Sequence, residues 1–156
     1  MIKRKIDRYL ADFFDTHKKA LMLTGARQIG KTYSIRRFGH EHFERFVEIN
    51  FIENPGLVKV FSKAKNCQDI LLRLSTVTSQ DFIKGNTLVF FDEVQECPEI
   101  VTAIKFLVEE GSYRYILSGS LLGVEIKNLR SAPVGYLPCA AAVFLHQLVC
   151  WYLHSH

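Results

Sequence analysis

Residues 21–35, LMLTGARQIGKTYSI, decide the fold of this chain. The run Ala20–Thr24 is short and apolar, which predicts a buried strand. Gly25 and the triplet at residues 30–32 then fill the pattern G-x-x-x-x-G-K-[ST], directly before a helical segment. A strand, a glycine-rich loop and a helix in this order indicate a phosphate-binding loop, or P-loop, rather than a chance glycine turn.

The predicted loop suits a nucleotide and its magnesium ion. Backbone N–H groups curl around phosphate oxygens, and glycine permits a close approach that a Cβ atom would block. Lys31 can supply positive charge to the β- and γ-phosphates and the Thr32 hydroxyl a ligand to Mg²⁺, while the next helix offers its positive N-terminal end. The expected nucleotide contacts are Gly25, Ala26, Arg27, Gln28, Ile29, Gly30, Lys31, Thr32 and Tyr33.

Two carboxylates close a second apolar run, LVFFDE at residues 88–93. Ligands of open α/β sheets lie at the carboxyl ends of the strands, where Asp92 and Glu93 are expected. Asp92 is placed to hold Mg²⁺, and Glu93 to orient or deprotonate the attacking water. An isolated Asp-Glu pair is more often a polar turn, but the upstream P-loop favours a site, and the adjacent acid favours hydrolysis.

A third polar group, Ser118 and Ser120, follows the next apolar run in YILSGS. These side chains are expected at the same sheet edge, where they could contact the γ-phosphate or the lytic water, although Ser-Gly-Ser is also ordinary turn chemistry. A guanine-nucleotide site is disfavoured because no D-x-x-G glycine follows Asp92 and no N-K-x-D motif is present. ATP is therefore the expected nucleotide.

The rest of the apolar pattern alternates strands with helices, which predicts a mostly parallel sheet with right-handed crossovers. In the N-terminal amphipathic helix, the basic cluster of Lys3, Arg4, Lys5 and Arg8 is expected on a solvated face, with a phosphate-backbone contact as the alternative. Helices are expected over residues 1–16, from the P-loop to Gly39, and over Gly56–Ala64, Cys67–Val77 and Pro98–Glu110. His40 and His42 are expected on the surface, after the second helix. Strands are expected over Ala20–Thr24, Phe46–Phe51, Thr87–Phe91 and Tyr113–Leu117.

The segments GARQIGKT, VEINF, VFFDEVQECP, YILSGS and SAPVGY, in this order, resemble the prokaryotic AAA-type P-loop ATPases, whose ATPase domain precedes a C-terminal domain often described as restriction-endonuclease-like. The resemblance covers about residues 3–137. It implies a three-layer α/β core with strand order 5-1-4-3-2. It also implies binding of ATP and Mg²⁺ by Lys31, Thr32 and Asp92, with a catalytic acid at Glu93.

The composition changes at Pro138. The 20 Lys and Arg and the 16 Asp and Glu residues all lie before it, so residues 138–156 carry none. We expect a P-loop ATPase domain over 1–137 (N-terminal helix 1–16, core 19–137) and an atypical tail over 138–156, from truncation or a frameshift. The fold would then be incomplete at its C-terminus, with a fifth strand missing or replaced, no adenine-side lid, and Arg130 as a weak candidate for an arginine finger.

The tail suggests two further readings that we disfavour. Its apolar stretch is shorter than the roughly 20 residues that a membrane span needs. His146, Cys150 and His154 recur at a four-residue spacing with Cys139 upstream, which could hold Zn²⁺, but an unselected tail would contain such residues freely.

Length and composition fit one globular domain. The chain has 156 residues, of which 48% are hydrophobic and 23% charged, which excludes a disordered or collagen-like chain. The net charge of +4 is too small to be a nucleic-acid footprint by itself. The four cysteines form no C-x-x-C pair and no secretory segment follows Met1, so a cytoplasmic location is expected.

Three hypotheses follow. The first is a Mg²⁺-dependent ATPase domain that binds ATP and ADP. The second is a nucleotide-gated binding module without turnover, whose ATP state controls a protein or nucleic-acid partner. The third is a non-functional remnant that cannot cover its sheet edge and aggregates. The oligomeric state stays open.

Overall fold

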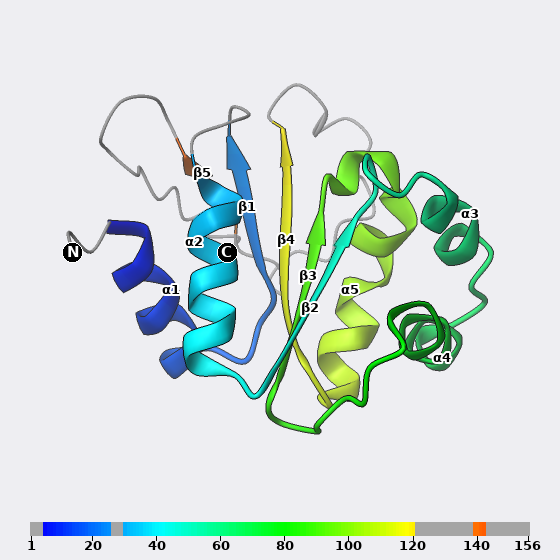
Figure 1. Cartoon of the computed structure of the whole chain (residues 1–156), viewed down its shortest axis with the longest axis horizontal. Helices are drawn as coiled ribbons and strands as arrows, with labels where there is room; N and C mark the ends of the chain where they lie inside the picture. Colours follow the sequence, from blue (N-terminus) through cyan, green and yellow to red (C-terminus); the bar gives the residue numbers. More distant parts are fainter. Residues whose placement is uncertain (1–4, 26–29, 121–138, 143–156) are drawn as a thin grey trace, which may run out of the picture.

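The computed structural model of the protein describes residues 5–25, 30–120 and 139–142 (Figure 1). Helices and strands alternate along the chain, as the apolar pattern predicts. In chain order the elements are α1 (Lys5–Thr16), β1 (Leu21–Gly25), α2 (Lys31–His42), β2 (Arg45–Asn50), α3 (Gly56–Ser62), α4 (Cys67–Thr78), β3 (Thr87–Asp92), the short 3₁₀ helix η1 (Val94–Glu96), α5 (Pro98–Glu110), β4 (Arg114–Ser120) and β5 (Cys139–Ala142).

The strands form one parallel sheet with the order β2-β3-β4-β1-β5. This is the predicted order 5-1-4-3-2, read from the other edge. The fifth strand is present and pairs with β1, from Met22 opposite Cys139 to Gly25 opposite Ala142. It comes from the uncharged segment, where we expected a strand to be missing or replaced.

Helices cover both faces of the sheet, which gives the predicted three layers. In Figure 1, α1 and α2 lie on one side of the strands and α3, α4 and α5 on the other. Each strand sends alternate side chains to opposite faces, so Leu88 and Phe90 of β3 pack into the cluster on the α1 and α2 side, whereas Val89 and Phe91 pack into the other. β3 is buried at all six positions, which the apolar run Thr87–Phe91 predicted for the first five; the sixth is Asp92.

The ends of α5 follow from its sequence. Pro98 is its first residue, where a missing N–H costs nothing, and Gly111 caps its end in the left-handed conformation with φ of 79°. The predicted range Pro98–Glu110 is confirmed. The predicted starts at Gly56, Cys67 and Thr87 and the predicted end at residue 16 are confirmed as well, and the other boundaries within the described residues differ by one to three residues, which is the usual uncertainty at the ends of elements.

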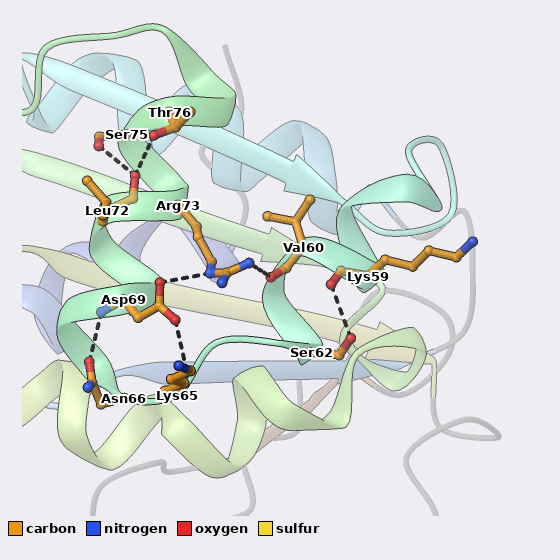
Figure 2. A network of polar contacts seen from close by, with 10 residues as sticks. All are labelled: Lys59, Val60, Ser62, Lys65, Asn66, Asp69, Leu72, Arg73, Ser75 and Thr76. Atoms are coloured by element: carbon orange, nitrogen blue, oxygen red, sulfur yellow. Dashed lines mark hydrogen bonds and ion pairs between the residues drawn. The ribbon is translucent and has the colours of Figure 1, made fainter.

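The corner between α3 and α4 is fixed by a polar network around Asp69 (Figure 2). Its carboxylate accepts a hydrogen bond from Nε of Arg73 at 2.8 Å and one from the backbone N–H of Lys65 at 3.0 Å. Arg73 also donates to the carbonyl oxygen of Val60 at 2.9 Å, and the Asn66 side chain caps α4 by accepting from the N–H of Asp69 at 2.9 Å. The bond from Arg73 holds the pKa of Asp69 below its ordinary value.

The predicted end of α2 at Gly39 is wrong. The helix continues to His42, and Gly39 lies buried inside it. A Cβ atom at this position would lie 2.2 Å from the Phe46 ring, so this glycine allows close packing of α2 on β2 and does not stop the helix. His40 and His42 are exposed, as expected, but they belong to the helix.

Several expectations fall on residues outside the described ranges. They concern the basic residues Lys3 and Arg4, the loop residues 26–29, the arginine-finger candidate Arg130 and the zinc candidates His146, Cys150 and His154. In the part of the chain that is described, Arg8 is exposed, as a solvated face requires. None of the described helices combines the length and apolar character needed to cross a bilayer.

Candidate functional site

Three polar residues lie in one row across the carboxyl ends of neighbouring strands. Asn50 of β2 is opposite Asp92 of β3, and Asp92 is opposite Ser118 of β4. Because the strands are parallel, these ends meet at one edge of the sheet, where open α/β folds bind ligands. The sequence predicted Asp92 and Ser118 at this edge.

The P-loop and the start of α2 complete this edge. Gly25 ends β1 opposite Ser120 of β4. Gly30 precedes α2 with φ of 79° and ψ of 15°, a left-handed conformation that glycine adopts without strain. The first two residues of α2 are Lys31 and Thr32, so both are placed at the positive end of the helix.

Lys31 crosses from α2 to the end of β4. Its Nζ atom donates to the carbonyl oxygen of Gly119 at 3.2 Å. Burial lowers the pKa of the Lys31 ammonium, while the nearby carboxylates of Asp92 and Glu93 act in the opposite direction. A partly desolvated cation close to two carboxylates is suited to an anionic ligand that brings its own counter-ion.

Asp92 is the most constrained acid of the site. Its Oδ2 atom accepts from Nδ2 of Asn50 at 3.2 Å and lies 3.4 Å from the donating hydroxyl of Thr32, and its Oδ1 atom accepts from the Glu93 N–H at 2.9 Å. Burial raises the pKa of Asp92 from an ordinary 3.8 to about 6, and the charge of Glu93 adds to this rise. This buried carboxylate would therefore be stabilised by a bound cation.

Glu93 turns out of the strand into η1. Its backbone has φ of 59°, in the left-handed region that residues other than glycine rarely adopt. The side chain of Gln95, two residues further on, donates from Nε2 to Oε2 of Glu93. Glu93 thus follows Asp92 in sequence but presents its carboxylate from an irregular turn.

A cavity of about 540 Å³ brings these groups together. The predicted site residues that line it are Gly30, Lys31, Thr32, Asp92, Glu93 and Ser118. Ser118 is buried. Tyr33, also expected to contact nucleotide, is not among the lining residues; it is 54% exposed, and its ring lies 5.7 Å from the guanidinium of Arg37. Ser120 ends β4 beside Gly25, and residues 26–29 lie outside the described ranges.

The remaining lining residues were not singled out from the sequence: Arg36, Asn50, Ile52 and Glu53. Asn50 has a definite place, because its Oδ1 accepts from the N–H groups of Ile52 and Glu53, both at 2.9 Å, while its Nδ2 holds Asp92. The signal that could have identified it is the same one that identified Asp92, a polar residue at the end of an apolar strand.

The chain was compared with known proteins, and one of the comparisons shows its family. No curated protein matches the chain. Among solved structures that match it, C. elegans PCH-2 has 14% sequence identity over 89% of this chain and 40% of that chain, with a TM-score of 0.48. The family model described as "AAA domain" matches residues 17–140, which is most of the sequence. The chain therefore belongs to the AAA domain family and is a nucleotide-binding domain of the ATPase type.

Proposed function

We propose that this chain binds ATP with Mg²⁺ and hydrolyses it to ADP and phosphate. The observation that carries the proposal is the convergence of Lys31, Thr32, Asp92, Glu93 and Ser118 on one cavity at the carboxyl edge of the sheet. These residues come from three separate segments of the chain. They supply the positive charge, hard oxygen ligands and general base that phosphoryl transfer to water requires.

In this proposal the phosphates lie at the N-terminus of α2. The proposed contacts are backbone N–H groups that donate to phosphate oxygens. They come from the residues between Gly25 and Tyr33, namely Ala26, Arg27, Gln28, Ile29 and Gly30. Lys31 moves from the carbonyl of Gly119, 3.2 Å away, to the β- and γ-phosphates. The exchange replaces one neutral acceptor with charged ones, which form stronger hydrogen bonds.

The residues present fit a magnesium ion. Mg²⁺ prefers oxygen ligands, and the hydroxyl of Thr32 and the carboxylate of Asp92 lie 3.4 Å apart at the cavity wall. Burial and the charge of Glu93 raise the pKa of Asp92, and the charge of Lys31 opposes this rise only in part, so a bound cation would stabilise the ionised carboxylate. When bound, the ion would neutralise charge on the phosphates during transfer.

Glu93 is proposed to accept the proton of the attacking water. It lines the cavity next to Asp92 and is the remaining carboxylate of the Asp-Glu pair. Ser118, buried opposite Asp92 in the sheet register, is proposed to contact the γ-phosphate or the water, and Ser120 at the end of the same strand to assist it.

Binding without turnover is the second candidate, and one observation favours it. Among the lining residues that the structure describes, the arginine is Arg36, and it donates two hydrogen bonds of 2.7 Å to Glu48. An arginine that stabilises the transferring phosphate is commonly worth 10³-fold or more in rate. Without such a group, ATP would act as a gate for a protein or nucleic-acid partner.

The decisive experiment compares the melting temperature and phosphate release of the whole chain with those of Lys31→Ala and Glu93→Gln. At an Mg²⁺-ATP concentration 100-fold above Kd, bound ligand adds about 2.7 kcal/mol, or a rise of about 5 to 10 °C. We expect Lys31→Ala to abolish the rise and Glu93→Gln to keep it without turnover. Lys59→Ala, which removes an exposed charge from α3, is the matched control.

The outcomes separate the candidates. Phosphate release that both site variants abolish supports hydrolysis. A thermal shift that depends on Lys31, with no phosphate release above that of Glu93→Gln, supports the second candidate, a module that binds ATP without turnover. A melting temperature indifferent to ATP would contradict both.

A further inference from the structure

Glu93 has a backbone conformation that its neighbours must hold in place. Its φ of 59° is uncommon for a residue with a Cβ atom. Its carbonyl accepts from the N–H of Glu96 at 3.1 Å, and the N–H of Cys97 bonds to Val94 at 3.0 Å. The side chains of Val94 and Cys97 are fully buried, so η1 is anchored to the core on one side.

Gln95 lies in the middle of this anchored turn and fixes one oxygen of the Glu93 carboxylate. Its Nε2 donates to Oε2 of Glu93, whereas Oε1 of Glu93 accepts no hydrogen bond from any described residue. Glu93 lines the cavity, but Gln95 is not one of its lining residues. The amide therefore acts on the carboxylate without itself meeting a ligand in the cavity.

The other end of the same amide argues against a purely structural role. The Oε1 atom of Gln95 is buried and has no hydrogen-bond partner among the described residues. A buried polar atom without a partner destabilises a fold by about 1 to 3 kcal/mol. An apolar side chain of the same length would avoid this cost, so stability alone does not explain the glutamine.

We propose that Gln95 is a positioning residue for Glu93, in addition to the groups already assigned. Its N–H holds Oε2, so that Oε1 faces the cavity in a fixed direction and can accept the proton of the attacking water. This inference rests on the proposed hydrolysis, because Glu93 acts as a base only in that reaction. Gln95 itself touches neither nucleotide nor water.

The test is Gln95→Met, which keeps the length of the side chain and removes the donor. We expect kcat to fall about ten- to a hundredfold, since hydrogen bonds to charged groups are worth that factor. KM and the ATP-induced rise in melting temperature should stay at the wild-type values. Gln68→Met, the same replacement at an exposed position of α4, should change nothing.

A double-mutant cycle shows whether Gln95 acts through Glu93. In the Glu93→Gln background, Gln95→Met should leave the residual single-turnover rate unchanged, because the group that it positions is already gone. An equal further loss in that background would mean an independent effect and would overturn the proposal. A loss of ATP binding in Gln95→Met would overturn it as well.

The remaining results separate this inference from the proposed function. Wild-type turnover in Gln95→Met, with turnover abolished in Lys31→Ala, overturns the role of Gln95 and leaves hydrolysis intact. Wild-type phosphate release no higher than that of Lys31→Ala overturns both. If Gln95→Met loses its cooperative melting transition, Gln95→Leu, which also lacks the donor and adds no charge, takes its place in each comparison.

Discussion

Asp92 is a carboxylate that the fold keeps almost wholly out of water, with 6% of its surface exposed. Its pKa is raised to about 6, mainly by burial and then by the charge of Glu93. The native state thus binds more protons than the unfolded state between about pH 4 and pH 6. The free energy of unfolding therefore falls as the pH rises through this range.

We predict that Asp92→Asn stabilises the nucleotide-free chain. A rise in pKa from 3.8 to about 6 corresponds to about 3 kcal/mol at pH 7 and less than about 1 kcal/mol at pH 4. Urea unfolding should show a gain of about 1 to 3 kcal/mol at pH 7 and little gain at pH 4. The same variant should lose the Mg²⁺-dependent part of the ATP-induced rise in melting temperature.

An equal gain in the free energy of unfolding at both pH values would contradict the ionisation argument. The gain would then come from the contacts of the new amide group and not from the loss of a charge. Gln68→Met provides a control. It changes no charge at an exposed position of α4, away from Asp92, so its effect on stability should not depend on pH.

At the scale of residues, the sequence was informative where a motif specifies the spacing. The spacing of the P-loop predicted Lys31 and Thr32, and the end of an apolar run predicted Asp92. Asn50 ends a strand, as Asp92 does, and this signal was overlooked; its contact with Asp92 depends on the register of β2 with β3. Gln95 was missed because its role depends on a left-handed residue in an irregular turn, which sequence spacing does not reveal.

The packing of α2 on β2 depends on one glycine. Gly39 lies under the Phe46 ring, which is itself flanked by His40 at 5.0 Å and Phe90 at 6.3 Å between ring centroids. A methyl group at this position needs the ring to move, and both neighbours oppose that movement. α2 and β2 therefore approach more closely than any residue other than glycine at position 39 would allow.

Gly39→Ala should destabilise the chain although alanine is the better helix former. Alanine gains about 0.5 to 1 kcal/mol in a helix interior, whereas overpacking costs about 1 to 3 kcal/mol. We predict a net loss of about 1 to 2 kcal/mol in the free energy of unfolding. Gly56→Ala is the control, because a Cβ atom there meets nothing within 4 Å.

If the Phe46 ring is what opposes a Cβ atom at position 39, the effects of substitutions at Gly39 and Phe46 on the free energy of unfolding should be coupled. In a Phe46→Leu background, which removes the ring, Gly39→Ala should cost less than it does alone. Equal costs in the two backgrounds would show that Phe46 is not the obstacle, and a stabilising Gly39→Ala would contradict the packing argument.

This glycine also shows why element ends are harder to predict than elements. Glycine after a helical run is a common stop signal, and the sequence offers no means of distinguishing it from a glycine required by packing. The stop signal was correct at Gly111, where φ is 79°, and wrong at Gly39. The difference lies in the ring of Phe46, seven residues further on in another element.

At the scale of the whole molecule, the uncharged C-terminal segment contributes a strand to the sheet. Four residues of β5 pair with β1, from Met22 to Gly25. β1 leads directly into the P-loop, and without β5 it would be an edge strand with unpaired N–H and C=O groups. The sequence indicated that residues 138–156 differ in composition, but strand pairing is a long-range contact that composition does not reveal.

The last prediction tests whether this strand supports the nucleotide site. A chain ending at residue 137 loses four pairs of the ladder, and at a net 0.5 to 1.5 kcal/mol per hydrogen bond we expect a loss of about 2 kcal/mol or more, or a fall of roughly 5 °C in melting temperature. Because β1 positions Gly25, the ATP-induced rise should also shrink. A chain ending at residue 142 keeps β5 and is the matched control. If both chains melt and bind ATP alike, β5 contributes nothing to the site, and β1 holds the P-loop through its pairing with β4 alone.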